Sequence, residues 1–195
     1  MKFVFWYTIR SVFDKEYDEL SWNEYVKWRN FVNVKEIVSL DHNLNEPLID
    51  PFFQKQTTFY HTIYENNMGT GFFDEFNFLI KNIDENIKRY NLLTVVKEPN
   101  ESCDCILEGY DFIGYDLLDK HYYSTSSVTN CGDWNGLLKP EIINSFGLIN
   151  DFKVARKIQT MLREDFPEDD HADTVLFAVW RHLRYGQKQV TGERL

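Results

Sequence analysis

Cysteine and histidine side chains are the residues of this sequence best suited to catalysis. Cys131 lies in the run Asn130-Cys131-Gly132-Asp133, where the glycine would let a backbone amide approach an oxyanion. With His121 or His171 as general base, Cys131 could be the nucleophile of a small hydrolase or transferase. The local signatures of known cysteine hydrolases are absent, and an unreactive thiol in a glycine-containing turn explains the same residues.

A metal site is the second possibility. Cys103 and Cys105 form a C-x-C pair that Cys131 and His121 could complete. Zinc sites usually contain pairs spaced C-x₂₋₄-C, and this sequence lacks a second pair. Buried free cysteines are the ordinary alternative, so we expect neither a metal nor another cofactor.

The densest charge lies between Glu164 and Asp173, a run that surrounds His171 with carboxylates. His171 and Asp173 could form an acid/base pair, because a carboxylate can orient an imidazole. A hard cation could also bind there, but neither EF-hand nor HExxH spacing is present. The remaining interpretations are a solvated loop and an acidic loop that steers a basic protein toward it.

The composition argues against several function classes. The chain has 195 residues and a formal net charge of −10, so it would repel a phosphate backbone. We therefore expect no direct nucleic-acid binding. Phosphate-loop, dinucleotide-binding and G-x-S-x-G motifs are absent. Aromatic residues make up 16% of the chain, enough to fill a core and leave rings for a protein interface.

The sequence also indicates a compartment. Three cysteines, an odd number, argue against a secreted disulfide framework. The opening run MKFVFWYTIR lacks the pattern of a signal peptide, and no stretch approaches the ~20 apolar residues of a membrane span. We expect a cytoplasmic protein with no membrane contact.

Apolar periodicity predicts one α+β domain over residues 1–195, with a mixed or largely antiparallel sheet flanked by about three helices. Gly109 and Gly114 are candidate bulges in a long strand, and residues 186–195 form a polar tail that could be disordered. Strands are expected at 2–10, 37–40, 57–65, 92–96, 105–118 and 175–181, with 122–129 as the hairpin partner of 105–118.

Three amphipathic helices should flank this sheet. Ser21 opens the first, because Ser21 and Glu24 have capping-box spacing. The second covers about residues 73–90. The third follows the N-cap Asp151 and runs to about Glu164. This arrangement places Cys131 and the acidic run in loops.

Several short motifs in the C-terminal half resemble a known group of proteins. The motifs are Gly114 to Asp119, Thr129 to Gly132, Gly147 to Asp151, His171 to Asp173, and Trp180-Arg181. Over about residues 105–182, the chain resembles immunity proteins of bacterial contact-dependent and polymorphic toxin systems. The resemblance implies a cytoplasmic, non-enzymatic inhibitor that binds and blocks a cognate toxin domain, often a nuclease. It supplies no catalytic residues.

We therefore expect a toxin-neutralising protein that binds a basic partner through an acidic, aromatic-bearing face. Trp134 is the expected aromatic anchor, whose removal should weaken binding without unfolding the chain. The alternative is a hydrolase or transferase that uses Cys131 or the His171/Asp173 pair. The expected contact residues are Asp116, Asp119, Asp133, Trp134, Glu168, Asp169, Asp170, His171 and Asp173.

Overall fold

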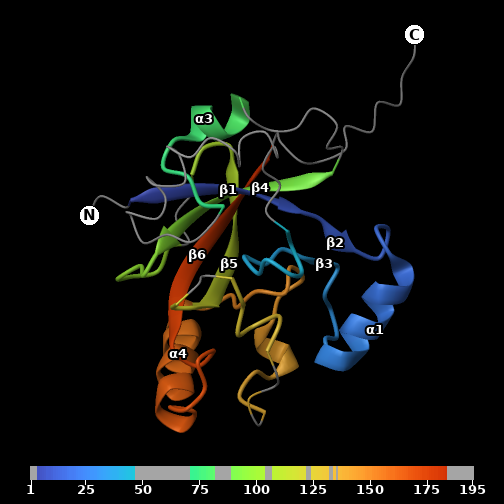
Figure 1. Cartoon of the computed structure of the whole chain (residues 1–195), viewed down its shortest axis with the longest axis vertical. Coiled ribbons are helices and arrows are strands. Elements are labelled where there is room, and N and C mark those ends of the chain that lie inside the picture. Colours follow the sequence, from blue (N-terminus) through green and yellow to red (C-terminus); the bar gives the residue numbers. More distant parts are fainter. Residues whose placement is uncertain are drawn as a thin grey trace.

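The computed structural model describes residues 4–46, 71–81, 89–103, 107–121, 124–131, 134 and 136–183. They form a single α+β domain with a four-stranded antiparallel sheet, a small two-stranded sheet and three α-helices, which confirms the predicted fold class (Figure 1). No helix in these ranges is both long enough and apolar enough to cross a membrane.

The main sheet has an inserted central strand. Its order is β1 (Phe5–Ser11), β4 (Tyr90–Lys97), β6 (Thr174–His182), β5 (Tyr110–Asp119), and every neighbouring pair is antiparallel. β6 follows the other three strands in sequence but lies between β4 and β5. All its side chains except Arg181 are buried. The predicted buried strand at 175–181 is therefore confirmed.

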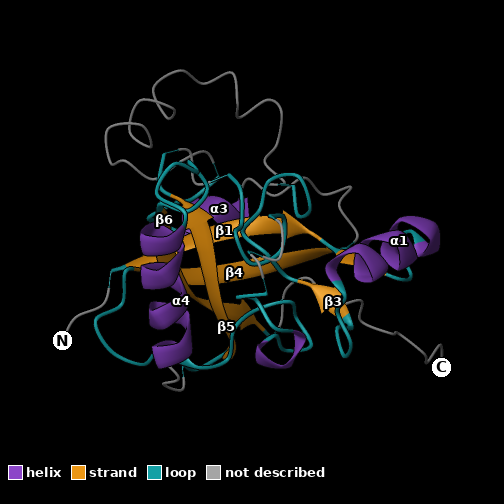
Figure 2. Ribbon diagram, turned by 90° about the horizontal axis from the view of Figure 1, so that it is seen from below, coloured by secondary structure: helices purple, strands orange, loops and turns teal. Residues whose placement is uncertain are grey.

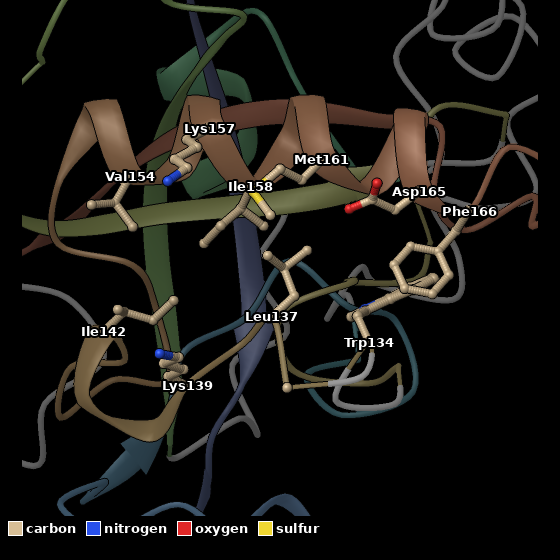
Figure 3. Close-up of a pocket in the computed structure, with 11 residues that line it drawn as sticks. Trp134, Leu137, Lys139, Ile142, Val154, Lys157, Ile158, Met161, Asp165 and Phe166 are labelled. Atoms are coloured by element: carbon tan, nitrogen blue, oxygen red, sulfur yellow. The ribbon is translucent and has the colours of Figure 1, made fainter.

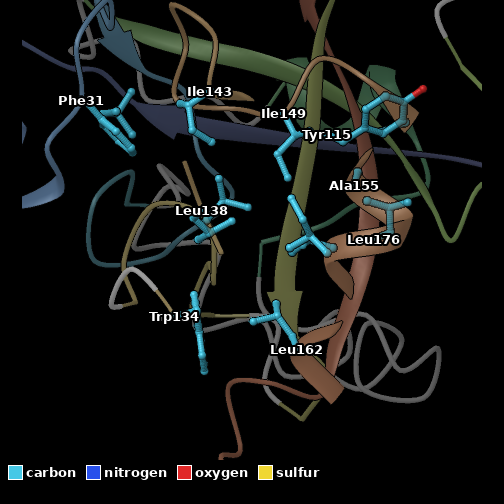
Figure 4. Packing of buried hydrophobic residues seen from close by; sticks show 14 of the residues in the cluster. Phe31, Tyr115, Trp134, Leu138, Ile143, Ile149, Ala155, Leu162 and Leu176 are labelled. Carbon is cyan, nitrogen blue, oxygen red and sulfur yellow. The ribbon is translucent and has the colours of Figure 1, made fainter. Parts of the chain in front are cut away.

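Both faces of the sheet are covered, because alternate side chains of each strand point to opposite sides. α4 (Phe152–Asp165) packs over β5 and β6 on one face, where Leu176 joins Ala155 and Leu162 in a core cluster (Figures 2 and 4). The opposite face carries a second cluster that includes Val38, Leu40, Phe72, Leu93, Leu148, Phe177 and Val179.

Local signals place α4 where the sequence predicts it. The Asp151 carboxylate accepts the backbone N–H of Val154 at 2.8 Å, which is an N-cap bond. Ala155, Ile158 and Leu162 are buried toward the sheet. The predicted cap and helix are both confirmed. α4 ends directly before residues 166–173, called the acidic loop below.

α1 (Glu19–Arg29) begins earlier than predicted. Asp18 is the N-cap instead of Ser21, and its carboxylate accepts the backbone N–H groups of Leu20 and Ser21, each at 3.1 Å. The Ser21 hydroxyl donates to the same carboxylate at 2.7 Å. A carboxylate brings a full negative charge to the positive end of the helix, so Asp18 is the better cap.

Two predicted strands differ from the structure. The segment at 37–40 pairs only through β3 (Glu36–Ile37), which forms the small sheet with β2 (Phe13–Asp14). The segment predicted at 122–129 as the hairpin partner lies antiparallel to β5, but its described residues form a single bridge, Ser126 to Leu118, and two backbone hydrogen bonds instead of a strand. The continuous ladder of β5 is with β6, on the opposite edge of the strand.

The second predicted helix lies partly within the described residues. The helix expected at 73–90 is present as α3 (Phe76–Lys81), and Phe73 precedes it because its backbone pairs with Tyr7 at the edge of β1. The segments and residues that lie outside the described ranges are 82–88, the strand expected at 57–65, the tail at 186–195, Cys105 and Asp133.

β5 bends at Gly114, one of the two candidate bulges. Its register with β6 shifts between Phe112 and Gly114. Gly114 has a φ of +134°, and an added Cβ would lie 2.8 Å from the Leu148 Cβ and 2.9 Å from the Ile149 carbonyl oxygen. Gly109 also has a positive φ, +83°, but nothing lies within 4 Å of an added Cβ there, and it precedes the strand. Gly114 therefore allows a close backbone approach.

Replacing Gly114 by alanine is expected to lower the free energy of unfolding by about 2–4 kcal/mol, because it adds a steric clash to backbone strain. Gly109→Ala is the matched control: it carries the strain without the clash and should cost about 1 kcal/mol. Urea unfolding followed by tryptophan fluorescence measures both values. Equal losses in the two variants would contradict the close contact at Gly114.

Candidate protein-binding surface

Buried carboxylates hold the surface loops from inside. Asp116 lies on β5 and is fully buried. It accepts hydrogen bonds from the hydroxyls of Ser39 at 3.0 Å and Ser126 at 2.5 Å. It also accepts the backbone N–H of Leu40 at 2.8 Å. One side chain thus joins two loop segments that are far apart in the sequence.

Asp41 holds both of these segments, and Asp119 holds the second one. The Asp41 carboxylate is buried, and its backbone N–H partners are Asn43, Leu44 and Ser126. Asp119 accepts the backbone N–H groups of Ser124 and Thr125 at 2.9 and 2.8 Å. Asp116 and Asp119 were predicted as partner contacts, yet both are buried. The structure therefore places them beneath the loops instead of on the surface.

A buried cation balances these carboxylates. Arg10 of β1 is fully buried, and its Nε donates to the Thr8 hydroxyl at 3.0 Å. Burial lowers the pKa of Arg10 to about 9, although the negative charges of Asp41 and Asp116 act to raise it. Burial raises the pKa of Asp116 above its ordinary value, although four hydrogen-bond donors oppose that shift. The charges of Asp41 and Asp116 thus reduce the cost of burying Arg10.

Cys131 lies in a setting that keeps its thiol protonated. Arg29 of α1 donates to the carbonyl oxygens of Cys131 and Val128, the latter at 2.6 Å. Burial first, and then the carboxylates of Asp169 and Asp41, raises the pKa of the Cys131 thiol to about 12. Only the thiolate is a good nucleophile, so this environment does not support the enzyme alternative.

His171 and Asp173 are close in sequence but do not form an acid/base pair here. Asp173 makes ion pairs with Lys120 at 3.0 Å and Arg163 at 3.1 Å. The His171 side chain is exposed, while its backbone carbonyl accepts the Ser127 hydroxyl at 2.7 Å. In the portion of the chain that the structure describes, no group of three His, Cys, Asp or Glu side chains could hold a metal ion.

The acidic loop displays its carboxylates from a hydrogen-bonded backbone. Asp169 N–H donates to the Phe166 carbonyl at 3.0 Å, and Ala172 N–H donates to the Asp169 carbonyl at 2.9 Å. Glu168, Asp169 and Asp170 are exposed. The structure therefore brings three predicted contact residues together on the surface, next to His171.

A groove runs along α4 (Figure 3). Its volume is about 660 Å³, and it lies between α4 on one side and Trp134 and the segment at 136–142 on the other. This volume is typical of sites that take a small ligand or a partner's side chains. Most of the lining side chains are apolar: Trp134, Leu137, Ile142, Val154, Ile158, Met161 and Phe166.

The groove continues into the acidic loop. Lys139 and Lys157 line one end, and Asp165 lies at the other end beside Phe166 (Figure 3). Asp165 and Phe166 also line a second, more open hollow of about 500 Å³, which the acidic loop forms. Groove and acidic loop together are called the groove face below. It presents apolar surface and carboxylates side by side.

Trp134 forms a wall of this groove but is not an exposed anchor. Its side chain is only 9% exposed, its Nε1 donates to the Ser127 carbonyl at 3.1 Å, and its ring lies edge-on to Phe166 with centroids 5.1 Å apart. Truncating a buried tryptophan typically costs about 3–5 kcal/mol. The expectation that Trp134 can be removed without loss of stability is therefore corrected.

An exposed apolar surface on and beside α1 was not predicted from the sequence. Trp22 and Tyr25 of this helix are buried. The clue in the sequence is that apolar residues occur all round this helix, more than one buried stripe needs. The exposed surface comprises Leu20 and Trp28 on α1, which are 70 and 58% exposed, and Tyr17 and Val32 shortly before and after the helix, which are 67 and 72% exposed.

Comparisons with known proteins leave the function open. The chain matches no protein-family model, no curated protein and no solved structure. A function for this chain must therefore be argued from its own surfaces and charges.

Asp116→Asn is expected to lower the free energy of unfolding by about 2–4 kcal/mol, because the amide NH₂ would face donors that now bind a carboxylate. Asp111→Asn, at an exposed position on the same strand, is the matched control and should change stability by less than about 0.5 kcal/mol. Urea unfolding at neutral pH measures both. If Asp116→Asn unfolded at the same urea concentration as the wild type, the loops would not depend on this carboxylate.

Cys131 in the folded chain should react with iodoacetamide on the order of a hundredfold more slowly than in the urea-unfolded chain, because its thiolate is scarce far below a pKa of about 12. The rate should rise with pH without a plateau near pH 8.5, the ordinary thiol range. Mass spectrometry of the Cys131 peptide over time gives both rates. Fast labelling of the folded chain at neutral pH would contradict this expectation and support Cys131 as a catalytic nucleophile.

Proposed function

We propose that this chain is an immunity protein that binds a cognate bacterial toxin domain in the cytoplasm and neutralises it by blocking. One observation carries the proposal: the apolar groove along α4 is continuous with the exposed acidic loop. An apolar centre beside a charged rim is the usual anatomy of a tight protein interface. The resemblance of residues 105–182 to immunity proteins supports the same function.

Charge suggests the class of toxin. Glu168, Asp169 and Asp170 project together from the acidic loop, and the whole chain carries a formal net charge of −10. Such a surface attracts a basic partner and raises the rate of association. Toxins that act on nucleic acids are basic around their active sites because they bind phosphates. A nuclease domain is therefore the favoured partner, with the acidic loop lying where its substrate would bind.

The groove supplies the apolar portion of the interface. Val154 and Met161 are only half-buried in the free chain, and Leu137 faces them across the groove (Figure 3). An apolar toxin side chain placed here would bury further surface, worth roughly 25 cal/mol per Å². Lys139 and Lys157 would meet a carboxylate of the toxin at the far end.

The test begins with affinity capture from a lysate of the source organism, followed by identification and purification of the partner. Glu168→Lys/Asp170→Lys should lower the association rate constant about tenfold at low salt, and added salt should narrow the difference. Glu108→Lys/Asp111→Lys makes the same change in net charge at exposed positions at the other end of β5, and it should affect the rate far less.

Two results would contradict the proposal. One is the absence of a stoichiometric partner. The other is a partner whose binding kinetics respond equally to both double variants, because net charge alone, and not the groove face, would then govern association. A purified toxin that keeps its activity while saturated with this chain would exclude neutralisation by blocking.

A further inference from the structure

One face of α4 forms a wall of the groove over about three helical turns. Val154, Lys157, Ile158, Met161 and Asp165 line the groove at helical spacing (Figure 3). At a rise of about 1.5 Å per residue, this stripe is about 17 Å long. A long apolar groove beside a helix suits an amphipathic segment of a partner, which buries a row of side chains at once.

The two ends of the groove carry opposite charges. Lys139 and Lys157 are exposed at one end, and Asp165 lies at the other end, next to the carboxylates of the acidic loop (Figure 3). Lys157 and Asp165 are separated by about 12 Å along α4, at about 1.5 Å per residue. A charged segment lying along the groove therefore has one favoured direction, with its positive end at the acidic loop and its negative end at the two lysines.

The backbone of the groove walls favours a helix as the occupant. One wall is α4, whose backbone hydrogen bonds run within the helix. In the other wall, the N–H groups of Leu137 and Ile142 donate to the carbonyl oxygens of Trp134 and Lys139, each at 3.1 Å. An extended segment would find no strand edge in these two described walls, and its own N–H and C=O groups would lose water against apolar side chains. A helix satisfies those groups internally.

Helix dipoles favour the same direction as the side-chain charges. A partner helix antiparallel to α4 places its N-terminus at the acidic loop and its C-terminus at Lys139 and Lys157. The N-terminus of a helix carries partial positive charge and the C-terminus partial negative charge. Each end of such a helix therefore meets groups of opposite charge in the groove.

We propose that the groove binds one amphipathic helix of the partner, antiparallel to α4, with basic residues in its first turn and acidic residues in its last turn. The apolar stripe of this helix packs on Leu137, Ile158 and Met161. The inference rests on the proposed function for the identity of the partner, a toxin domain, but its test uses peptides alone. Absence of a toxin partner would reject the immunity function, whereas the peptide results accept or reject the bound helix.

Two alanine-based peptides of about 16 residues, long enough to form a helix, test the direction of binding. Both carry leucines at helical spacing. The forward peptide has lysines in its first turn and glutamates in its last turn, and the reversed peptide exchanges them. Isothermal titration calorimetry at low salt should show that the forward peptide binds at least about tenfold more tightly. Intrinsic helix stability works against this result, because lysines near the N-terminus oppose the dipole of the peptide.

Charge variants of the chain test the location of the bound peptide. Lys139→Glu/Lys157→Glu should weaken binding of the forward peptide about tenfold, because its last turn would then face like charges. Lys15→Glu/Lys27→Glu is the matched control: it makes the same change in net charge at exposed lysines on and beside α1, which Figures 1 and 2 show well away from α4. The control should bind the forward peptide within about twofold of the wild type.

A forward peptide with a central proline tests whether the occupant is a helix. Proline breaks a helix, so this peptide should bind at least about tenfold more weakly. Four results would overturn the proposal: no binding of the forward peptide at about millimolar concentration, equal affinities of the forward and reversed peptides, undiminished binding of the proline peptide, or equal losses in the two lysine variants.

Discussion

The burial of the Asp116 carboxylate is the constraint on which the loops of this protein depend. A carboxylate removed from water costs several kcal/mol unless nearby groups donate hydrogen bonds to it. Ser39, Leu40 and Ser126 supply those bonds only when two segments far apart in the sequence come together over β5. Arg10 of β1 is also fully buried, and the charges of Asp41 and Asp116 favour its protonated form. A local electrostatic need thus determines a long-range arrangement.

The proposed binding face is attached to this arrangement through Ser127, the neighbour of Ser126. The Ser127 carbonyl accepts the indole N–H of Trp134, which is a wall of the groove, and the Ser127 hydroxyl donates to the His171 carbonyl in the acidic loop. The Trp134 wall of the groove and the acidic loop are therefore both hydrogen-bonded to Ser127. A surface that is already in place before binding loses less entropy when a partner arrives, which suits a tight inhibitor.

Elements governed by nearby residues could be predicted from the sequence, and those governed by distant ones could not. Asp151 and the stripe through Ala155 and Leu162 specify α4 locally, and the apolar run of β6 identifies a buried strand. The ladder of β5 with β6 depends on residues far apart along the chain and was not predicted, whereas the neighbouring segment at 122–129 does lie against β5, by a single bridge. From the sequence, Asp116 looks like an acidic residue on the surface, because the hydrogen-bond donors that allow its burial come from other segments of the chain. Trp134 looked exposed because turns usually are, yet Phe166 covers its ring.

The central claim is that the groove face, and not α1, receives the toxin. Hydrogen–deuterium exchange of the chain with and without the purified partner tests it most directly, because amides under an interface exchange more slowly. The account predicts partner-induced protection in residues 136–142, in α4 and in the acidic loop, with α1 unchanged. Protection of α1 or of the β1 edge, with the groove face exchanging as in the free chain, would contradict it.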